Sequence, residues 1–231
     1  LNAAGRSEYV CVDGAAQGQD VLGATADTAV GTSGTLYPTE TRGGLSSNYA
    51  DNKEVTCAQC SSSTGPAYVR WGRSTCPAAA TLLYAGRAAG SKYSEKSGYN
   101  YVCLHETPVY DQKTDTQQAS SGRLYRVEYD TSARGLWSMW ALDTKEVPCA
   151  VCQTTGATAT HMQPGSTTCP TGWSTEYSGF LMAERYTGSN HGRSEYVCVD
   201  GEAEAASGSD IAGDERARMS PVQIDSTLGA E

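Results

Sequence analysis

The chain has 231 residues, with 17 Lys and Arg against 26 Asp and Glu, so its formal net charge is -9. This acidity and the lack of a basic cluster argue against nucleic acid as a partner, because an acidic surface repels phosphate. No stretch approaches the roughly 20 apolar residues that cross a bilayer, so membrane insertion is not expected. Nine cysteines, 25 Gly and a single Phe are typical of a secreted, extracellular protein that is rich in turns and cross-linked by disulfides.

Four segments alternate apolar with polar residues and are rich in β-branched and aromatic side chains, as β-strands are. They lie at residues 68–71, 99–104, 124–129 and 195–199. Residues 78–89 could form one or two helical turns, although Gly86 and the flanking strand pattern count against it. Residues 12–35 and 201–231 have few apolar anchors and are expected to be loops or mobile ends. No ten-residue window carries a convincing helical apolar stripe, so the sequence predicts an all-β fold.

The sequence contains an internal repeat. The ten residues GRSEYVCVDG occur twice without change, at 5–14 and at 192–201. Identity over ten residues does not arise by chance, so part of one module is present more than once. The chain is therefore a piece of a tandem array, a permuted form of one module, or a sequence assembled from overlapping pieces.

A weaker repeat divides the module into two homologous, β-rich halves, each with four cysteines in the order TCP, YVC and CxxC. The first half is complete, in residues 61–160. The second half is split, with its leading part in residues 161–231 and its trailing part in residues 1–60. The distance from the YVC cysteine to the CxxC motif is 46 residues in each half: Cys103 to Cys149 and Cys11 to Cys57.

The two CxxC pairs have three possible interpretations, namely structural disulfides, a zinc site and a thioredoxin-like redox centre. Both pairs occupy equivalent places in the repeat and follow a strand signal. Neither precedes a helix whose N-terminus would lower the pKa of a thiol. These features favour structural disulfides, and no metal or other cofactor is expected.

The segment from Cys149 to Tyr186 resembles the junction between the two halves of the non-collagenous carboxy-terminal domain of type IV collagen. In that family a CAVC motif is followed by an apolar stretch, a CPSGW motif and an aromatic-Gly-aromatic element. The chain is similar, more closely still, to the short-chain, spongin-type collagens of sponges over residues 68–77, 169–182 and 193–200. No Gly-X-Y run is present, so these residues form no triple helix. The resemblance implies a disulfide-stapled, all-β module of two halves.

In that family each cysteine of a CxxC motif bonds back to an earlier cysteine. The resemblance implies these pairs: Cys76–Cys152, Cys103–Cys149, Cys169–Cys60, and either Cys198 or Cys11 with Cys57. Each of the first two closes a loop of tens of residues and is expected to stabilise the fold by roughly 3–4 kcal/mol. One cysteine of the nine is surplus in a monomer. We therefore expect the split half to be completed between the termini or between neighbouring chains.

No catalytic motif is recognisable, and only three histidines are present, so the sequence predicts no enzyme. A binding surface is the alternative, because aromatic faces and planar polar groups bind sugars. The loops that precede the YVC motifs carry both kinds of group, and the candidate carbohydrate-binding residues are Tyr99, Asn100, His191, Arg193 and Glu195. The other interpretation is that these tyrosines point into the core and the rest is ordinary loop polarity. Four tryptophans are expected in the core: Trp71, Trp137, Trp140 and Trp173.

Two functional hypotheses follow. The first is an extracellular structural module of the short-chain collagen type that mediates oligomerisation and matrix adhesion, because the type IV domain forms trimers and exchanges strands with its neighbours. The second is a soluble carbohydrate-binding protein, a lectin, on the same fold. Both predict a homo-oligomer with matrix components or glycans as partners. The sequence leaves open the ligand, the number of subunits, the order of residues 1–60 in the chain and any requirement for calcium.

Overall fold

The computed structural model describes residues 7–13, 15, 36–42, 49–95, 97–111, 121–132, 137–185, 194–209 and 216–224. These residues form eleven β-strands and one short 3-10 helix, which confirms the predicted all-β class. The strands are β1 (Thr39–Thr41), β2 (Glu54–Val55), β3 (Ala67–Trp71), β4 (Thr81–Gly90), β5 (Val102–His105), β6 (Tyr110–Asp111), β7 (Gly122–Tyr129), β8 (Pro148–Gln153), β9 (Gly179–Ala183), β10 (Val197–Asp200) and β11 (Ala217–Pro221). The helix is η1 (Trp137–Leu142). No helix in the described ranges has the length and hydropathy needed to cross a bilayer.

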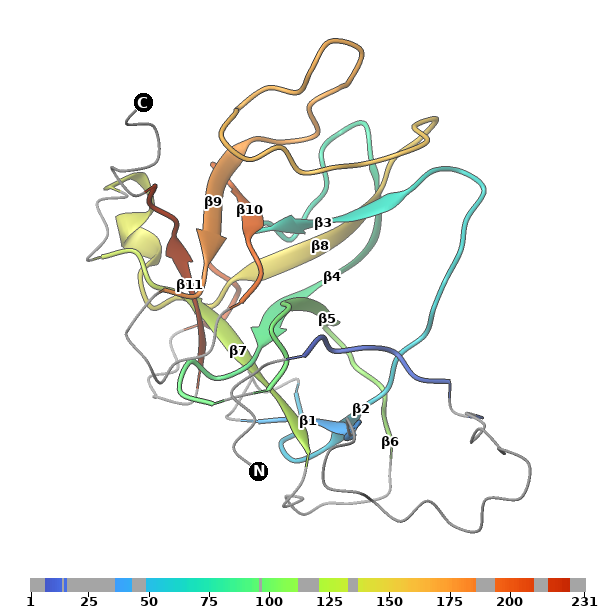
Figure 1. Cartoon of the computed structure of the whole chain (residues 1–231), viewed down its shortest axis with the longest axis vertical. Coiled ribbons are helices and arrows are strands. Elements are labelled where there is room, and N and C mark those ends of the chain that lie inside the picture. The colour runs from blue at the N-terminus through green and yellow to red at the C-terminus, as the bar shows by residue number, and fades with distance from the viewer. Residues whose placement is uncertain are drawn as a thin grey trace.

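One mixed sheet contains all of these strands, in the order β5-β4-β8-β3-β10-β9-β11-β7-β1-β2-β6. An additional pairing of β4 with β7 closes the strands from β4 round to β7 into a ring. Figure 1 shows β3, β8 and β4 side by side through the middle of the molecule, with β1, β2 and β6 at its lower end.

The four segments predicted as strands are strands β3, β5, β7 and β10 of this sheet. Residues 78–89, for which helical turns were one possibility, instead contribute most of β4, which pairs with β5, β7 and β8. Residues 201–231, expected to be a loop or mobile end, contain β11. Residues 12–35 lie almost wholly outside the described part of the chain.

Strands β9, β10 and β11 repeat the pairing of β4, β5 and β7 in the same register. The TCP motif recurs after 93 residues and the YVC motif after 95. Ala88 of β4 lies opposite Cys103, and Leu181 of β9, 93 positions later, lies opposite Cys198. The β4–β7 and β9–β11 pairings are related by the same shifts of 93 and 95 residues. Ala89–Arg126 corresponds to Met182–Pro221, and Gly90–Tyr125 corresponds to Ala183–Ser220. The internal repeat of the sequence is therefore also a repeat of strand register.

A glycine at the same place in each set allows two backbones to come close together. A Cβ atom on Gly86 would lie 1.9 Å from the carbonyl oxygen of Leu104, and one on Gly179 would lie 1.8 Å from that of Val199. No side chain fits at such a distance, so only glycine is compatible with this approach.

The main hydrophobic core joins the two halves. It contains Trp71, Ala88, Tyr101, Cys103, Val127, Tyr129, Met139, Val147, Cys149, Met182, Val197, Val199, Ala217 and Met219. Since these residues come from both sets of strands, the leading part of the second half packs directly on the first half. The expectation that the tryptophans belong to the core holds for Trp71, which is 7% exposed, but is wrong for Trp140 and Trp173, which are 50% and 46% exposed. These two lie in η1 and in a loop, outside the strands that bury side chains, and nothing is described of the Trp137 side chain.

Three disulfides cross-link the fold. Two of them, Cys76–Cys152 and Cys103–Cys149, are the pairs that the resemblance implied for the complete half. The third is Cys11–Cys57, so Cys11 and not Cys198 is the partner of Cys57 in this structure. Both CxxC cysteines of β8 are consequently bonded to cysteines outside the motif, one in the loop before β4 and one in β5, and neither is available for zinc or for a bond within the motif.

The expected bond between Cys169 and Cys60 is absent, and Cys60, Cys169 and Cys198 are free thiols. The bond of Cys57 to Cys11 holds the exposed Cys60 segment near residues 7–13. Figure 1 shows residues 7–13 beside the lower part of the sheet, whereas the loops of residues 154–178 lie at its top. The two thiols expected to pair are therefore kept apart within one chain.

Candidate functional site

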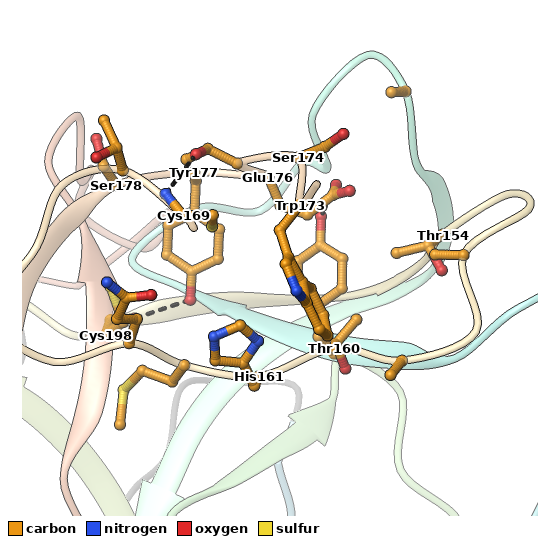
Figure 2. A pocket seen from close by; sticks show the side chains of 18 of the residues that line it. Thr154, Thr160, His161, Cys169, Trp173, Ser174, Glu176, Tyr177, Ser178 and Cys198 are labelled. Atoms are coloured by element: carbon orange, nitrogen blue, oxygen red, sulfur yellow. Dashed lines mark hydrogen bonds between the residues drawn. The ribbon is translucent and has the colours of Figure 1, made fainter. Parts of the chain in front are cut away.

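A groove of about 940 Å³ lies between β3 and the loops that precede β9. Its lining comes from residues 67–69, 71, 79, 154–163, 166–169, 172–178 and 196–198. The walls are rich in threonine and serine hydroxyls, and Figure 2 shows aromatic side chains and two cysteines among them. Among the ionisable side chains of the lining, Glu176 is the one carboxylate, and no Lys or Arg is included.

Tyr177 forms the centre of the groove. Its ring stacks on Tyr68 of β3 at 6.2 Å between centroids, and its hydroxyl donates hydrogen bonds to the carbonyl oxygens of Cys198, at 2.9 Å, and Val69, at 3.3 Å. Burial strongly raises the pKa of the Tyr177 hydroxyl, so it stays protonated and remains a donor at neutral pH. The Tyr68 hydroxyl donates to Glu176 at 2.8 Å. These contacts join β3 of the first half to the second half.

An exposed aromatic pair lies at the mouth of the groove. The His161 and Trp173 rings meet edge to face, with their centroids 4.5 Å apart. Figure 2 shows both rings beside Thr160, facing the space between the loops. Nearly half of the Trp173 surface is accessible, so an apolar face and polar hydroxyls are presented together.

Two of the three free thiols line this groove. In Figure 2, Cys169 and Cys198 lie near opposite ends of the Tyr177 side chain. Burial, with a smaller contribution from the Asp200 carboxylate, raises the pKa of the Cys198 thiol. A half-buried thiol with a raised pKa is a poor nucleophile at neutral pH, because the thiolate is the reactive form.

The groove is open because the described residues of the second half lack a strand that the first half has. In the first half, β8 fills the equivalent region. There β8 lies between β3 and β4, and its two cysteines bond Cys76 and Cys103, the counterparts of Cys169 and Cys198. Among the described residues of the second half, no strand takes the place of β8. Residues 155–175 are exposed throughout, apart from the half-exposed Cys169.

The structure brings together three of the five candidate carbohydrate-binding residues, outside the lining of the groove, where the backbone N–H of Glu195 donates to the carbonyl oxygen of Tyr99. Tyr99 donates from its hydroxyl to Glu8 at 2.6 Å, and the Asn100 side-chain oxygen accepts from the backbone N–H of Tyr9 at 2.7 Å. Glu195 accepts from a backbone N–H at 2.7 Å, and burial raises the pKa of its carboxyl group. The polar atoms of all three are thus engaged with the protein itself.

His191 and Arg193 lie outside the described residues, so the five-residue carbohydrate site stays a prediction. The groove residues Tyr68, His161 and Tyr177 lie outside the loops in which the sequence predicted a carbohydrate site. An aligned comparison of the two halves was the available signal, because it places His161 at the position of Tyr68 and Tyr177 at that of Tyr84.

Several buried ion pairs lie outside the lining of the groove. Arg70 contacts Asp200, Arg87 contacts Glu146 and Arg126 contacts Glu128, with each carboxylate nearly inaccessible. Within the described ranges, no three His, Cys, Asp or Glu side chains are grouped so as to hold a metal ion. No known family model matches the chain, and no solved structure is significantly similar to it.

Proposed function

We propose that this protein is a non-enzymatic, extracellular assembly module of the short-chain collagen type, which forms homo-oligomers and adheres to matrix. The observation that carries the proposal is the open second half. Its strands β9, β10 and β11 have the register of β4, β5 and β7, yet the described residues supply no counterpart of β8. Three cysteines of an otherwise bonded framework remain thiols. Secretion fits the three disulfides, which persist in oxidising compartments.

The physical reason for assembly is the segment 174–178, which lines the groove just before β9 and belongs to no strand in the described structure. An open strand edge exposes N–H and C=O groups that readily pair with another chain. Strand addition of this kind satisfies those groups and buries apolar surface at the same time. A module with one complete and one open half is therefore expected to associate.

The test is the solution mass of natively purified protein, measured by light scattering after size-exclusion chromatography and by sedimentation velocity over a concentration series. A homo-oligomer that persists on dilution is expected. A monomer at every concentration, under oxidising as well as reducing conditions, would contradict the proposal.

A second candidate function is carbohydrate binding, and one specific observation favours it. The exposed His161–Trp173 pair presents an aromatic face above a groove rich in hydroxyl groups, which is the combination that sugars need. A glycan array, run with and without calcium and again after reduction, tests this function. Saturable binding should be lost in Trp173→Ala and kept in Trp140→Ala, which removes an equally exposed tryptophan away from the groove.

A further inference from the structure

The first half shows how a CxxC strand fills the place that the groove leaves open. Strand β8 pairs with β4 so that Cys149 lies opposite Gly86 and Cys152 lies opposite Leu82. From these positions Cys149 bonds the YVC cysteine and Cys152 bonds the TCP cysteine. Register and disulfides thus specify a single docking geometry for a CxxC strand.

The second half offers the same geometry at the groove. The shift of 93 residues carries Leu82 to Thr175 and Gly86 to Gly179. An incoming CxxC strand beside Thr175–Gly179 would place its first cysteine next to Cys198 and its second next to Cys169. The two thiols that line the groove are therefore the two partners that such a strand requires.

The side-chain support around this place is also preserved. The Tyr84 hydroxyl donates to the carbonyl oxygen of Cys103 at 3.1 Å, just as the Tyr177 hydroxyl donates to that of Cys198 at 2.9 Å. The close approach that Gly179 allows repeats that of Gly86. These two features of the docking place are accordingly already present in the folded chain.

The chain itself contains a second CxxC strand sequence. Residues 54–60 read EVTCAQC and match EVPCAVC of residues 146–152 at five of seven positions. Cys60 is an exposed free thiol, and residues 56–64 are accessible over most of their length. This segment is held away from the groove of its own chain by the bond of Cys57 to Cys11.

We propose that residues 57–60 of a second copy of this chain, which follow its β2, enter the groove as a strand beside Thr175–Gly179, and that Cys60 of that copy bonds Cys169. The inference rests on the proposed assembly function and names its contact. Because every copy carries one such segment and one such groove, the contact is heterologous. It closes into a reciprocal dimer or a ring, or else continues as a chain of subunits.

The covalent step needs an oxidant of the disulfide class, such as oxidised glutathione. The Cys60 and Cys169 thiols lose two protons and two electrons to form one S–S bond, and the glutathione disulfide is reduced to two thiols. A following exchange requires no oxidant. The Cys198 thiolate attacks the Cys57 sulfur, the Cys57–Cys198 bond forms, and Cys11 leaves as a thiolate that takes up a proton.

The identical decapeptides give Cys11 and Cys198 the same neighbours in sequence, because both occupy the same place in GRSEYVCVDG. Burial of Cys198 makes the exchange the slower of the two steps, since less thiolate is present at neutral pH. The Cys60–Cys169 bond is thus expected to form first, and it provides the sharper test.

The experiment mixes two full-length variants, Cys60→Ser and Cys169→Ser, in a buffer of reduced and oxidised glutathione. Each variant lacks one of the two sulfurs, so neither can form the bond with itself, whereas the mixture can form it in one direction. At least a tenfold greater yield of cross-linked dimer is expected in the mixture than in either variant alone, by non-reducing electrophoresis. Neither serine removes a disulfide of the folded chain, and circular dichroism checks that both variants fold.

Peptide mapping of wild-type protein, mixed from unlabelled and nitrogen-15-labelled copies, identifies the linkage. A Cys60–Cys169 peptide pair with one labelled and one unlabelled member is the expected product. A pair whose members always share one label would show a bond within one chain and overturn the proposal, as would cross-links through Cys60 alone. If non-covalent oligomers form without the Cys60–Cys169 bond, the docking inference fails while the assembly function stands. If only monomers are found, both fail.

Discussion

Replacing Arg70 with methionine is expected to destabilise the fold strongly, because it leaves a carboxylate buried without its partner. The guanidinium contacts the Asp200 Oδ2 through Nε and Nη2, each at 2.7 Å, and donates from Nη1 to the carbonyl oxygen of Thr75 at 2.9 Å. The two charged side chains are only 11% and 4% exposed, so water screens them little. The pair links β3 of the first half to β10 of the second half.

The size of the effect follows from this geometry. Two unit charges 2.7 Å apart attract each other by about 6 kcal/mol at an effective dielectric constant of about 20, before the cost of removing both from water is counted. Loss of one partner of such a pair costs about 3–5 kcal/mol, since the other charge stays buried. For a chain of this size, that corresponds to a fall in melting temperature of roughly 10 °C.

The assay is urea unfolding followed by tryptophan fluorescence, with the double variant Arg70→Met, Asp200→Leu as its control. The double variant is expected to recover much of the lost stability, because replacing both charges with apolar groups removes the unpaired carboxylate. A loss below about 1 kcal/mol in the single variant, or a double variant as unstable as the sum of the two singles, would refute the reasoning.

Gly179→Ala should cost several kcal/mol and expose the second half to proteolysis, because the new methyl group would lie 1.8 Å from the Val199 carbonyl oxygen and force β9 from β10. Cys103→Ser combined with Cys149→Ser should lower the free energy of unfolding by about 4 kcal/mol, as expected for a cross-link that spans 46 residues, in chemical denaturation at constant redox conditions. Alkylation of Cys198 by iodoacetamide should be slow at neutral pH. Its rate should keep rising tenfold per pH unit beyond the usual thiol range, because burial raises its pKa and lowers the thiolate fraction.

The glycine, disulfide and alkylation predictions each have a control or a result that would contradict them. Gly156→Ala meets no atom within 4 Å and should cost only the strain of a positive φ of 77°, so equal damage from both glycine variants would argue against a steric cause. Serine at Cys169 breaks no disulfide and should leave the free energy of unfolding almost unchanged. Cys198 alkylation with the pH profile of an exposed small thiol would show that the side chain is not buried.

The fold class could be predicted from the sequence because its signals are local. Alternation of apolar and polar residues indicated β3, β5, β7 and β10, and the cysteine motifs indicated two related halves. Strand β4 was harder to predict, because its sequence TLLYAGRAAG carries small residues in place of a clear alternation. It is a strand because β5, β7 and β8 supply its hydrogen bonds, and β7 and β8 come from distant parts of the chain.

The groove could not be predicted from any single segment. It exists because one CxxC strand lies between β3 and β4, while the described residues place nothing at the equivalent position of the second half. The same limit applied to the candidate residues Tyr99, Asn100 and Glu195. Their types suit sugar binding, but the packing of residues 7–9 against them engages their polar atoms.

The two copies of GRSEYVCVDG show most clearly which properties the sequence determines and which the tertiary structure determines. Their identical residues determine the same strand propensity and the same cysteine, and the sequence by itself shows that much. In the second copy Val197 and Val199 are buried in β10, whereas in the first copy Val10 and Val12 are 55% and 51% exposed. The physical reason is that a strand needs a neighbour for its backbone hydrogen bonds and its apolar face. Only the tertiary structure, which supplies β9 to one copy alone, decides which of the two is folded into the sheet.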